Sequence, residues 1–187
     1  MKKVTLFLIA VTLLTACLTL NAQDLDLKKH PGYIDLNEIK IPDHAAEVTD
    51  IDLGPALLAL LRMADDDDDD FGEGLANLAS IRVKSWELER EESARDLLPL
   101  MDKIETKLKD DNWVRLIRTK SDYEFTNISM KFENNKIVGF FLMSIDDDEV
   151  SFINIIGGNI DLNSIRNIGA GIKDSQLDSL KRTLERL

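Results

Sequence analysis

Hydrophobic and polar positions along the chain predict two helices in its first two thirds. Residues 93–109 are the clearer case, since five apolar positions share one face while charged residues lie opposite: Leu97, Leu98, Met101, Ile104 and Leu108. Pro99 lies near the start of this helix, where the first turn tolerates a proline. Another helix is expected to begin at Pro55 and to run through Leu61. Because that stretch is apolar almost all round, we expect it to be buried.

Alternating and continuous apolar runs predict the strands. A short strand is expected at residues 48–53, and Leu75, Leu78 and Ala79 suggest a helical turn further on. Ile81 and Val83 then alternate with polar residues, which is typical of a half-buried strand. Four more strands are expected, at residues 112–118, 123–132, 136–145 and 149–156.

The links between the last strands define their direction. Asn134 and Asn135 suit a tight hairpin turn, as do residues 146–148, and such short links require antiparallel neighbours. Residues 137–143 and 150–156 are apolar on both faces, which indicates central strands covered on both sides by helices or by a partner. The pattern therefore predicts one α+β domain, with an antiparallel sheet of about five or six strands and helices packed on it.

Two helical stretches are expected to close the chain. Asp161 can cap residues 162–168, which end at Gly169. Residues 169–187 form a predicted C-terminal amphipathic helix with a leucine stripe at Leu177, Leu180, Leu184 and Leu187. That stripe would pack on the sheet of its own chain or on a partner helix.

The N-terminus predicts export. Lys2 and Lys3 precede an apolar run at residues 4–14, which is typical of a secretory signal and too short to span a bilayer. Residues 14–17 resemble a bacterial lipobox, so we favour a signal at residues 1–16 and lipidation of Cys17. The alternative is an ordinary signal at residues 1–22, cleaved after Ala22. Residues 23–45 are expected to be a tether or an irregular segment leading into a domain at residues 46–168.

Composition restricts the chemistry that this domain can perform. The chain has 23 Lys and Arg against 35 Asp and Glu, a net charge of −12, which argues against nucleic acid as a partner. A single Cys and two His exclude an internal disulfide and most metal or thiol chemistry. The glycines do not form a phosphate-binding loop, and the serines do not form a nucleophile elbow, so we expect neither a cofactor nor an enzyme.

Six consecutive aspartates, residues 65–70, are the most tempting candidate for a metal site. Asp65, Asp67 and Asp69 match the first ligand positions of an EF-hand loop. However, Asp70 replaces the required Gly and Ala76 the required Glu, so the motif fails. A solvated loop is favoured, with weak divalent-ion binding as the alternative.

Other candidates have ordinary structural explanations as well. His30 and His44 are expected to be exposed rather than paired on a metal. Trp86, Trp113 and Tyr123 suit packing better than a ligand-stacking surface. A carboxylate pair for acid–base chemistry cannot be singled out from the sequence.

Several segments together resemble a known family. They are Ile81–Val83, a strand led by Trp113, and a closing strand 154–157 followed by Ile160, Asp161 and Leu162. This pattern is similar to the exported bacterial domain-of-unknown-function family 4252 over residues 46–168. The resemblance implies an exported single domain, but it carries no activity or catalytic residues.

These observations favour an exported, lipid-anchored protein that acts as a non-enzymatic binding or interaction module. The protein would face the periplasm or the cell surface, or be soluble there if Cys17 is not lipidated. Its expected partners are an envelope protein or a second copy of the chain. Two other functions stay open: a hydrolase of envelope polymers that uses carboxylates, and a weak divalent-cation binder.

Overall fold

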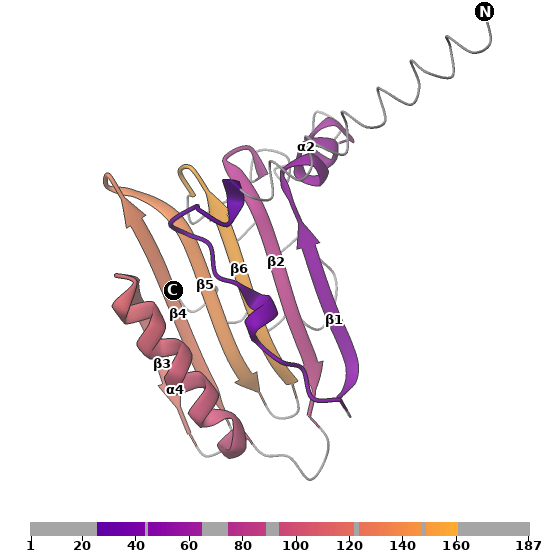
Figure 1. Cartoon of the computed structure of the whole chain (residues 1–187), viewed down its shortest axis with the longest axis vertical. Coiled ribbons are helices and arrows are strands. Elements are labelled where there is room, and N and C mark those ends of the chain that lie inside the picture. The colour runs from indigo at the N-terminus through magenta and orange to yellow at the C-terminus, as the bar shows by residue number, and fades with distance from the viewer. Residues whose placement is uncertain are drawn as a thin grey trace, which may run out of the picture.

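The computed structural model describes residues 26–43, 45–64, 75–88, 94–121, 124–146 and 149–160. Its centre is one six-stranded antiparallel sheet with the order β1-β2-β6-β5-β4-β3, which confirms the predicted α+β class (Figure 1). The strands are β1 (Ala46–Leu53), β2 (Leu78–Glu87), β3 (Val114–Lys120), β4 (Phe125–Glu133), β5 (Lys136–Asp146) and β6 (Glu149–Gly157).

Local turns define the register of the second half of the sheet. Asn134 and Asn135 both have positive φ, 50° and 61°, as a tight turn between β4 and β5 requires. β5 and β6 pair down to Asp146 opposite Glu149. Both strands lie in the middle of the sheet with fully buried aromatic side chains, so the prediction of two central strands is confirmed.

One face of the sheet, called the front face here, is covered by residues 26–43 and by α4 (Ala94–Asp110) (Figure 1). The N-terminal segment crosses this face and contains one short 3₁₀ helix, η1 (Leu36–Glu38). Leu27, Leu36 and Ile39 of this segment are buried. Of the two alternatives for residues 23–45, a tether or an irregular segment, the described residues 26–43 match the second, since they pack on the sheet.

This cover also changes the interpretation of β2. Arg82 and Lys84 point to the front face and are buried beneath the N-terminal segment. The strand is thus buried on both faces rather than half-buried, because a packed segment replaces the solvent that the polar residues led us to expect. Leu78 and Ala79 open this strand instead of forming a helical turn.

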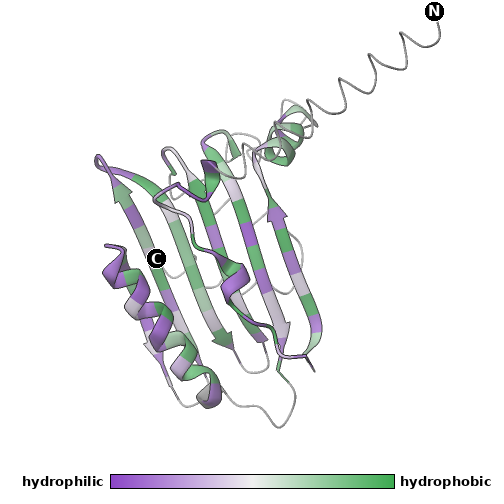
Figure 2. Cartoon of the chain, viewed as in Figure 1, coloured by the Kyte–Doolittle hydropathy of each residue, from purple (hydrophilic) through white to green (hydrophobic). Residues whose placement is uncertain are grey.

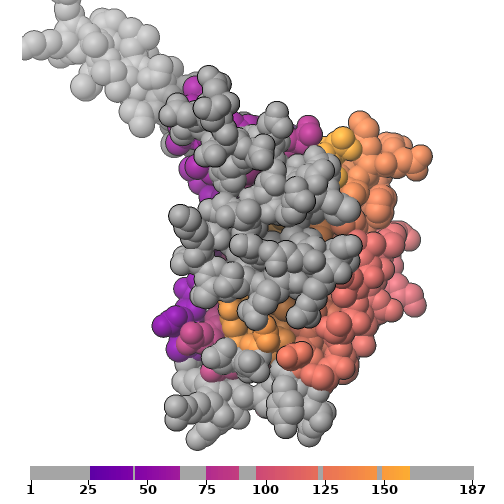
Figure 3. All heavy atoms as spheres, turned by 180° about the vertical axis from the view of Figure 1, so that it is seen from behind, coloured from indigo at the N-terminus to yellow at the C-terminus, as the bar shows by residue number. Residues whose placement is uncertain are grey.

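The opposite face, called the back face, carries a hydrophobic cluster of its own. It includes Leu58 from α2 (Pro55–Ala64), together with residues from four strands and the segment after β6: Ile81, Val83, Ile128, Phe140, Leu142, Ile153, Ile155 and Ile160. Seen from this side, β1 lies toward one edge of the molecule and β4 toward the other (Figure 3).

Helices α2 and α4 differ in how much apolar surface they bury. α4 follows the predicted helix closely and continues through Pro99, which lies beyond its first turn. α2 is also where the sequence predicted a helix, but the expectation that it is buried is wrong. Leu57, Leu60 and Met63 are exposed, and α2 is largely apolar in Figure 2. Among the described residues, no helix combines the length and hydropathy needed to cross a membrane.

Candidate functional site

A cleft opens on the front face between α4 and the strands β3 and β4. It encloses about 540 Å³ and is lined by residues from all three elements: Asp102, Glu105, Thr106, Leu108, Lys109, Trp113, Arg115, Asn127 and Ser129. Beyond the end of α4, Asn112 has a φ of 58°, and Trp113 N–H donates to the Leu108 carbonyl. This cap turns Trp113 onto the sheet, where its ring meets the Phe141 ring edge-on at 6.4 Å.

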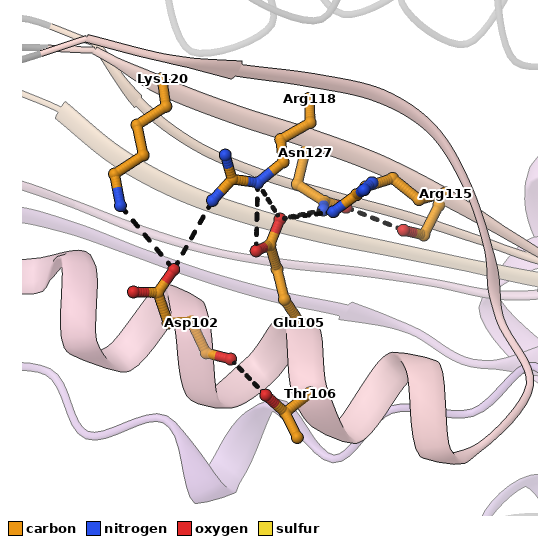
Figure 4. Close-up of polar contacts among 8 residues, drawn as sticks. Asp102, Glu105, Thr106, Arg115, Arg118, Lys120 and Asn127 are labelled. Carbon is orange, nitrogen blue, oxygen red and sulfur yellow. Dashed lines mark hydrogen bonds and ion pairs between the residues drawn. The ribbon is translucent and has the colours of Figure 1, made fainter.

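Glu105 is the centre of a polar network in this cleft (Figure 4). Its Oε1 accepts hydrogen bonds from Arg118 Nε at 2.8 Å and from Asn127 Nδ2 at 2.7 Å. Arg115 Nη1 lies 3.7 Å from the same oxygen. Only 15% of the Glu105 side chain is exposed, so these contacts are shielded from solvent on most sides.

Further contacts extend the network along the helix and the sheet. Asp102 Oδ1 lies 3.6 Å from Arg118 Nη2 and 3.9 Å from Lys120 Nζ. On the sheet, Asn127 Oδ1 accepts a hydrogen bond from Ser129 Oγ at 2.8 Å. Because Ser129 fixes the Asn127 amide, its Nδ2 is directed at the Glu105 carboxylate.

The network holds charges in defined states. Burial alone would raise the pKa of Glu105, but hydrogen bonds from Arg118 and Asn127, with the charges of Arg118 and Arg115, hold this pKa below its usual range. The hydrogen bond to Glu105 in turn raises the pKa of Arg118. Glu105 is therefore ionised at neutral pH, and its charge is balanced within the cleft.

A β-bulge explains why two arginines converge on one glutamate. Residues three apart on a regular strand point to opposite faces, which would separate Arg115 from Arg118. The β3–β4 register shifts between Arg115 and Ile117, so that Arg115 pairs with Ser129 and Arg118 with Asn127. Both arginines consequently face α4.

Another polar cluster on the front face has a structural role. Arg82 Nε pairs with Asp52 at 3.0 Å and Arg82 Nη1 donates to the Ile34 carbonyl, while Lys84 Nζ donates to the Leu36 carbonyl. Asn154 Oδ1 accepts from Ile34 N–H. These bonds satisfy backbone groups of the N-terminal segment and fasten it to β2 and β6.

The candidate residues named from the sequence lie elsewhere. Cys17, His44, Tyr123 and the aspartates Asp65, Asp67 and Asp69 fall outside the described residues. No group of three potential metal ligands occurs among the residues that are described. His30 is half-buried, and its Nδ1 accepts from Gly32 N–H. Trp86 stacks on Phe152 in the core, as packing predicts.

Sequence reasoning missed the Glu105 network. In the sequence Glu105 lies on the charged side of the predicted helix 93–109, and its arginine partners come from another element whose bulge the sequence does not reveal. The available signal was three cations on one short strand: Arg115, Arg118 and Lys120.

Comparison with known proteins shows the family of this chain. A profile of the DUF4252 family, a domain of unknown function, matches residues 43–168. The chain therefore belongs to this family, which confirms the resemblance found in its sequence. Searches of curated proteins and of solved structures each found no match.

Proposed function

We propose that this chain is an exported, lipid-anchored envelope protein that acts as a non-enzymatic binding module, and that the α4 cleft is its ligand site. The signal-like N-terminus and Cys17 support export and anchoring. The cleft supports binding, since it combines an apolar wall at Trp113 and Leu108 with fixed polar groups.

The distribution of charge in the cleft indicates the chemical class of the ligand. Glu105 is neutralised by Arg118, whereas the side chain of Arg115 is 56% exposed and meets Glu105 only at 3.7 Å. Lys109 also lines the cleft and forms no ion pair with any described residue. These two cations suit a small organic ligand with a carboxylate or phosphate group, which a guanidinium binds with paired hydrogen bonds.

The same geometry favours binding over hydrolysis. A carboxylate-dependent glycosidase needs one carboxyl group that stays protonated near neutral pH. In this cleft the lowered pKa keeps Glu105 ionised, and both Asp102 and Glu105 are paired with Arg118. The arrangement stabilises the charge of Glu105 and disfavours proton donation by this residue.

The ligand class can be tested by thermal unfolding of the chain from residue 23 onward with defined probes. Citrate and glucose 6-phosphate are expected to raise the melting temperature, and uncharged trehalose is not. Replacing both Arg115 and Lys109 by Gln should abolish the rise, while Lys136→Gln on the β4–β5 hairpin should preserve it. An equal rise with trehalose, or a rise that survives the double substitution, would contradict the proposal.

Export and anchoring need a separate test in cells. The mature protein is expected to begin at Cys17, to carry acyl chains in its intact mass and to fractionate with membranes. Cys17→Ser should move it to the soluble fraction. A mature mass that begins at Gln23 and is indifferent to the substitution would instead show a free secreted domain.

A further inference from the structure

α2 exposes apolar side chains and directs its charged residue toward the protein, which is the reverse of an ordinary surface helix. The exposed fractions of Leu57, Leu60 and Met63 are 49%, 61% and 84%. The one charged residue of the helix, Arg62, points toward the protein, where it donates to the carbonyls of Leu75 and Leu78 at 3.0 and 2.7 Å. Apolar side chains thus face outward, while the guanidinium of the helix is bonded to backbone carbonyls of the domain.

The helix is held firmly in this orientation. Leu58 is completely buried in the back-face cluster, and the two hydrogen bonds of Arg62 tie the last turn to Leu75 and to Leu78, the first residue of β2. Pro55 opens the first turn, where its fixed φ suits a helix. The exposed leucines therefore lie on a fixed platform.

α2 lies at the end of the sheet where the described chain begins. It follows the last residue of β1 and leads toward Leu78, which pairs with Gly157 at the end of β6. The N-terminal segment begins at the same end, because Gly32 packs directly on Val138 and Gly139, next to Ile156 (Figure 1). From there the segment runs toward the other end of the sheet.

The length of chain before this point restricts where the anchor can lie. Leu27 is buried in the domain and follows Cys17 by ten residues. Ten residues span at most about 35 Å when fully extended. An acyl anchor on Cys17 would therefore hold the α2 end of the domain within about 35 Å of the membrane, so that the exposed apolar side chains of α2 can reach the lipid.

We propose that α2 is an interfacial helix, which inserts Leu57, Leu60 and Met63 into the lipid surface to which Cys17 is anchored. This inference rests on the lipid anchor of the proposed function. Apolar side chains in the headgroup boundary would add a second contact to the acyl chains and orient the domain on the membrane. The cleft lies over β3 and β4, at the sheet edge opposite β1, so docking leaves it open to ligand.

The negative charge that follows α2 in the sequence indicates which lipid headgroups the helix would favour. Residues 65–70, all aspartates, directly follow α2 in the sequence. Their charge repels anionic headgroups, so docking is expected on zwitterionic phosphatidylcholine vesicles and should weaken when phosphatidylglycerol is added.

The test uses the chain from residue 17 onward with Cys17→Ser, which carries no acyl group, in flotation with phosphatidylcholine vesicles. The wild-type helix should bring the chain to the vesicle fraction, and replacing Leu57, Leu60 and Met63 by Gln should weaken vesicle binding about tenfold. The control replaces Val114 and Leu116, exposed apolar residues of β3, by Gln and should bind as the parent does. Circular dichroism verifies folding, and Leu60→Ala gives a milder variant.

The outcomes separate this proposal from its alternatives. Absence of vesicle binding, or binding that the α2 substitutions leave unchanged, overturns it. A dimer that the same substitutions convert to a monomer, without vesicle binding, would show that α2 contacts a second copy and would also overturn it. Because this chain lacks acyl groups, the result does not depend on whether Cys17 is lipidated in cells, which the fractionation experiment decides by itself.

Discussion

Arg118 Nε lies 2.8 Å from Glu105 Oε1, and this contact joins β3 to α4 across the cleft. The same two elements are also joined by the ion pairs of Asp102 with Arg118 and Lys120. The Arg118 guanidinium also lies 5.6 Å above the Phe125 ring, so it is held from two sides. The pair therefore positions the helix on the sheet as well as shaping the site.

Glu105→Gln should lower the free energy of unfolding by about 1–3 kcal/mol, because the amide cannot balance the shielded charge of Arg118. Urea unfolding followed by circular dichroism measures this change. Glu124→Gln, at an exposed position before β4, is the matched control and should change stability by less than about 0.5 kcal/mol. Equal effects of the two substitutions would show that the network contributes nothing to stability.

Glu105 also predicts how stability depends on pH. Its folded pKa lies below the ordinary value of 4.5, so the folded state binds its proton less readily than the unfolded state. The corresponding stability is fully present above pH 4.5 and is lost as the pH falls through the lower, folded pKa. The difference in unfolding free energy between wild type and Glu105→Gln should shrink over that interval. A difference that stays constant down to pH 3, about 1.5 units below the reference value, would exclude this linkage.

His30 produces a second pH dependence near neutrality. Burial lowers its pKa from 6.5, against the opposing charge of Glu133, and its Nδ1 must be unprotonated to accept from Gly32 N–H. Stability is therefore complete above pH 6.5 and falls as the pH decreases from there toward the folded pKa. Melting temperatures between pH 7.5 and 5, about one unit or more on either side of the reference value, should decline more in wild type than in His30→Asn. Parallel declines would count against the role of His30.

Much of the fold could be predicted because its determinants are local. The strands from β3 to β6 follow from alternating or continuous apolar runs and from turn residues such as Asn134 and Asn135, whose effect needs no distant partner. The packed N-terminal segment could not be predicted in this way. Ile34 N–H donates a hydrogen bond to Asn154, 120 residues further along the chain. The residues around Ile34 in the sequence do not indicate this partner.

The candidate site was missed for a related reason. Polar residues such as Arg82 and Glu105 have the same appearance in a sequence whether they face solvent or a buried partner. Which of these applies depends on the β3 bulge and on what covers the front face, and both are properties of the assembled sheet. The opposite error occurred in α2, where apolar composition indicated burial but Leu60 faces outward.

Gly32→Ala should separate the N-terminal segment from the sheet. A Cβ at this position would lie 2.3 Å from the Val138 carbonyl oxygen, so backbone would have to move. We expect a loss of about 1–3 kcal/mol in unfolding free energy. Gly158→Ala is the matched control, since a Cβ there meets no atom within 4 Å. If both variants unfold at the same denaturant concentration, the close approach of Gly32 is not a determinant of stability.

Asn154→Leu should release the same segment from within the core. Asn154 Oδ1 accepts from Ile34 N–H and its Nδ2 donates to the Gly32 carbonyl, so the substitution leaves buried backbone groups without partners. The free energy of unfolding should fall by about 2–4 kcal/mol, and trypsin should cleave faster after Lys40. Asn127→Leu, which loosens α4 instead, is the control for general destabilisation and should leave that cleavage rate nearer to wild type. Equal acceleration in the two variants would mean that the segment opens only when the whole domain unfolds.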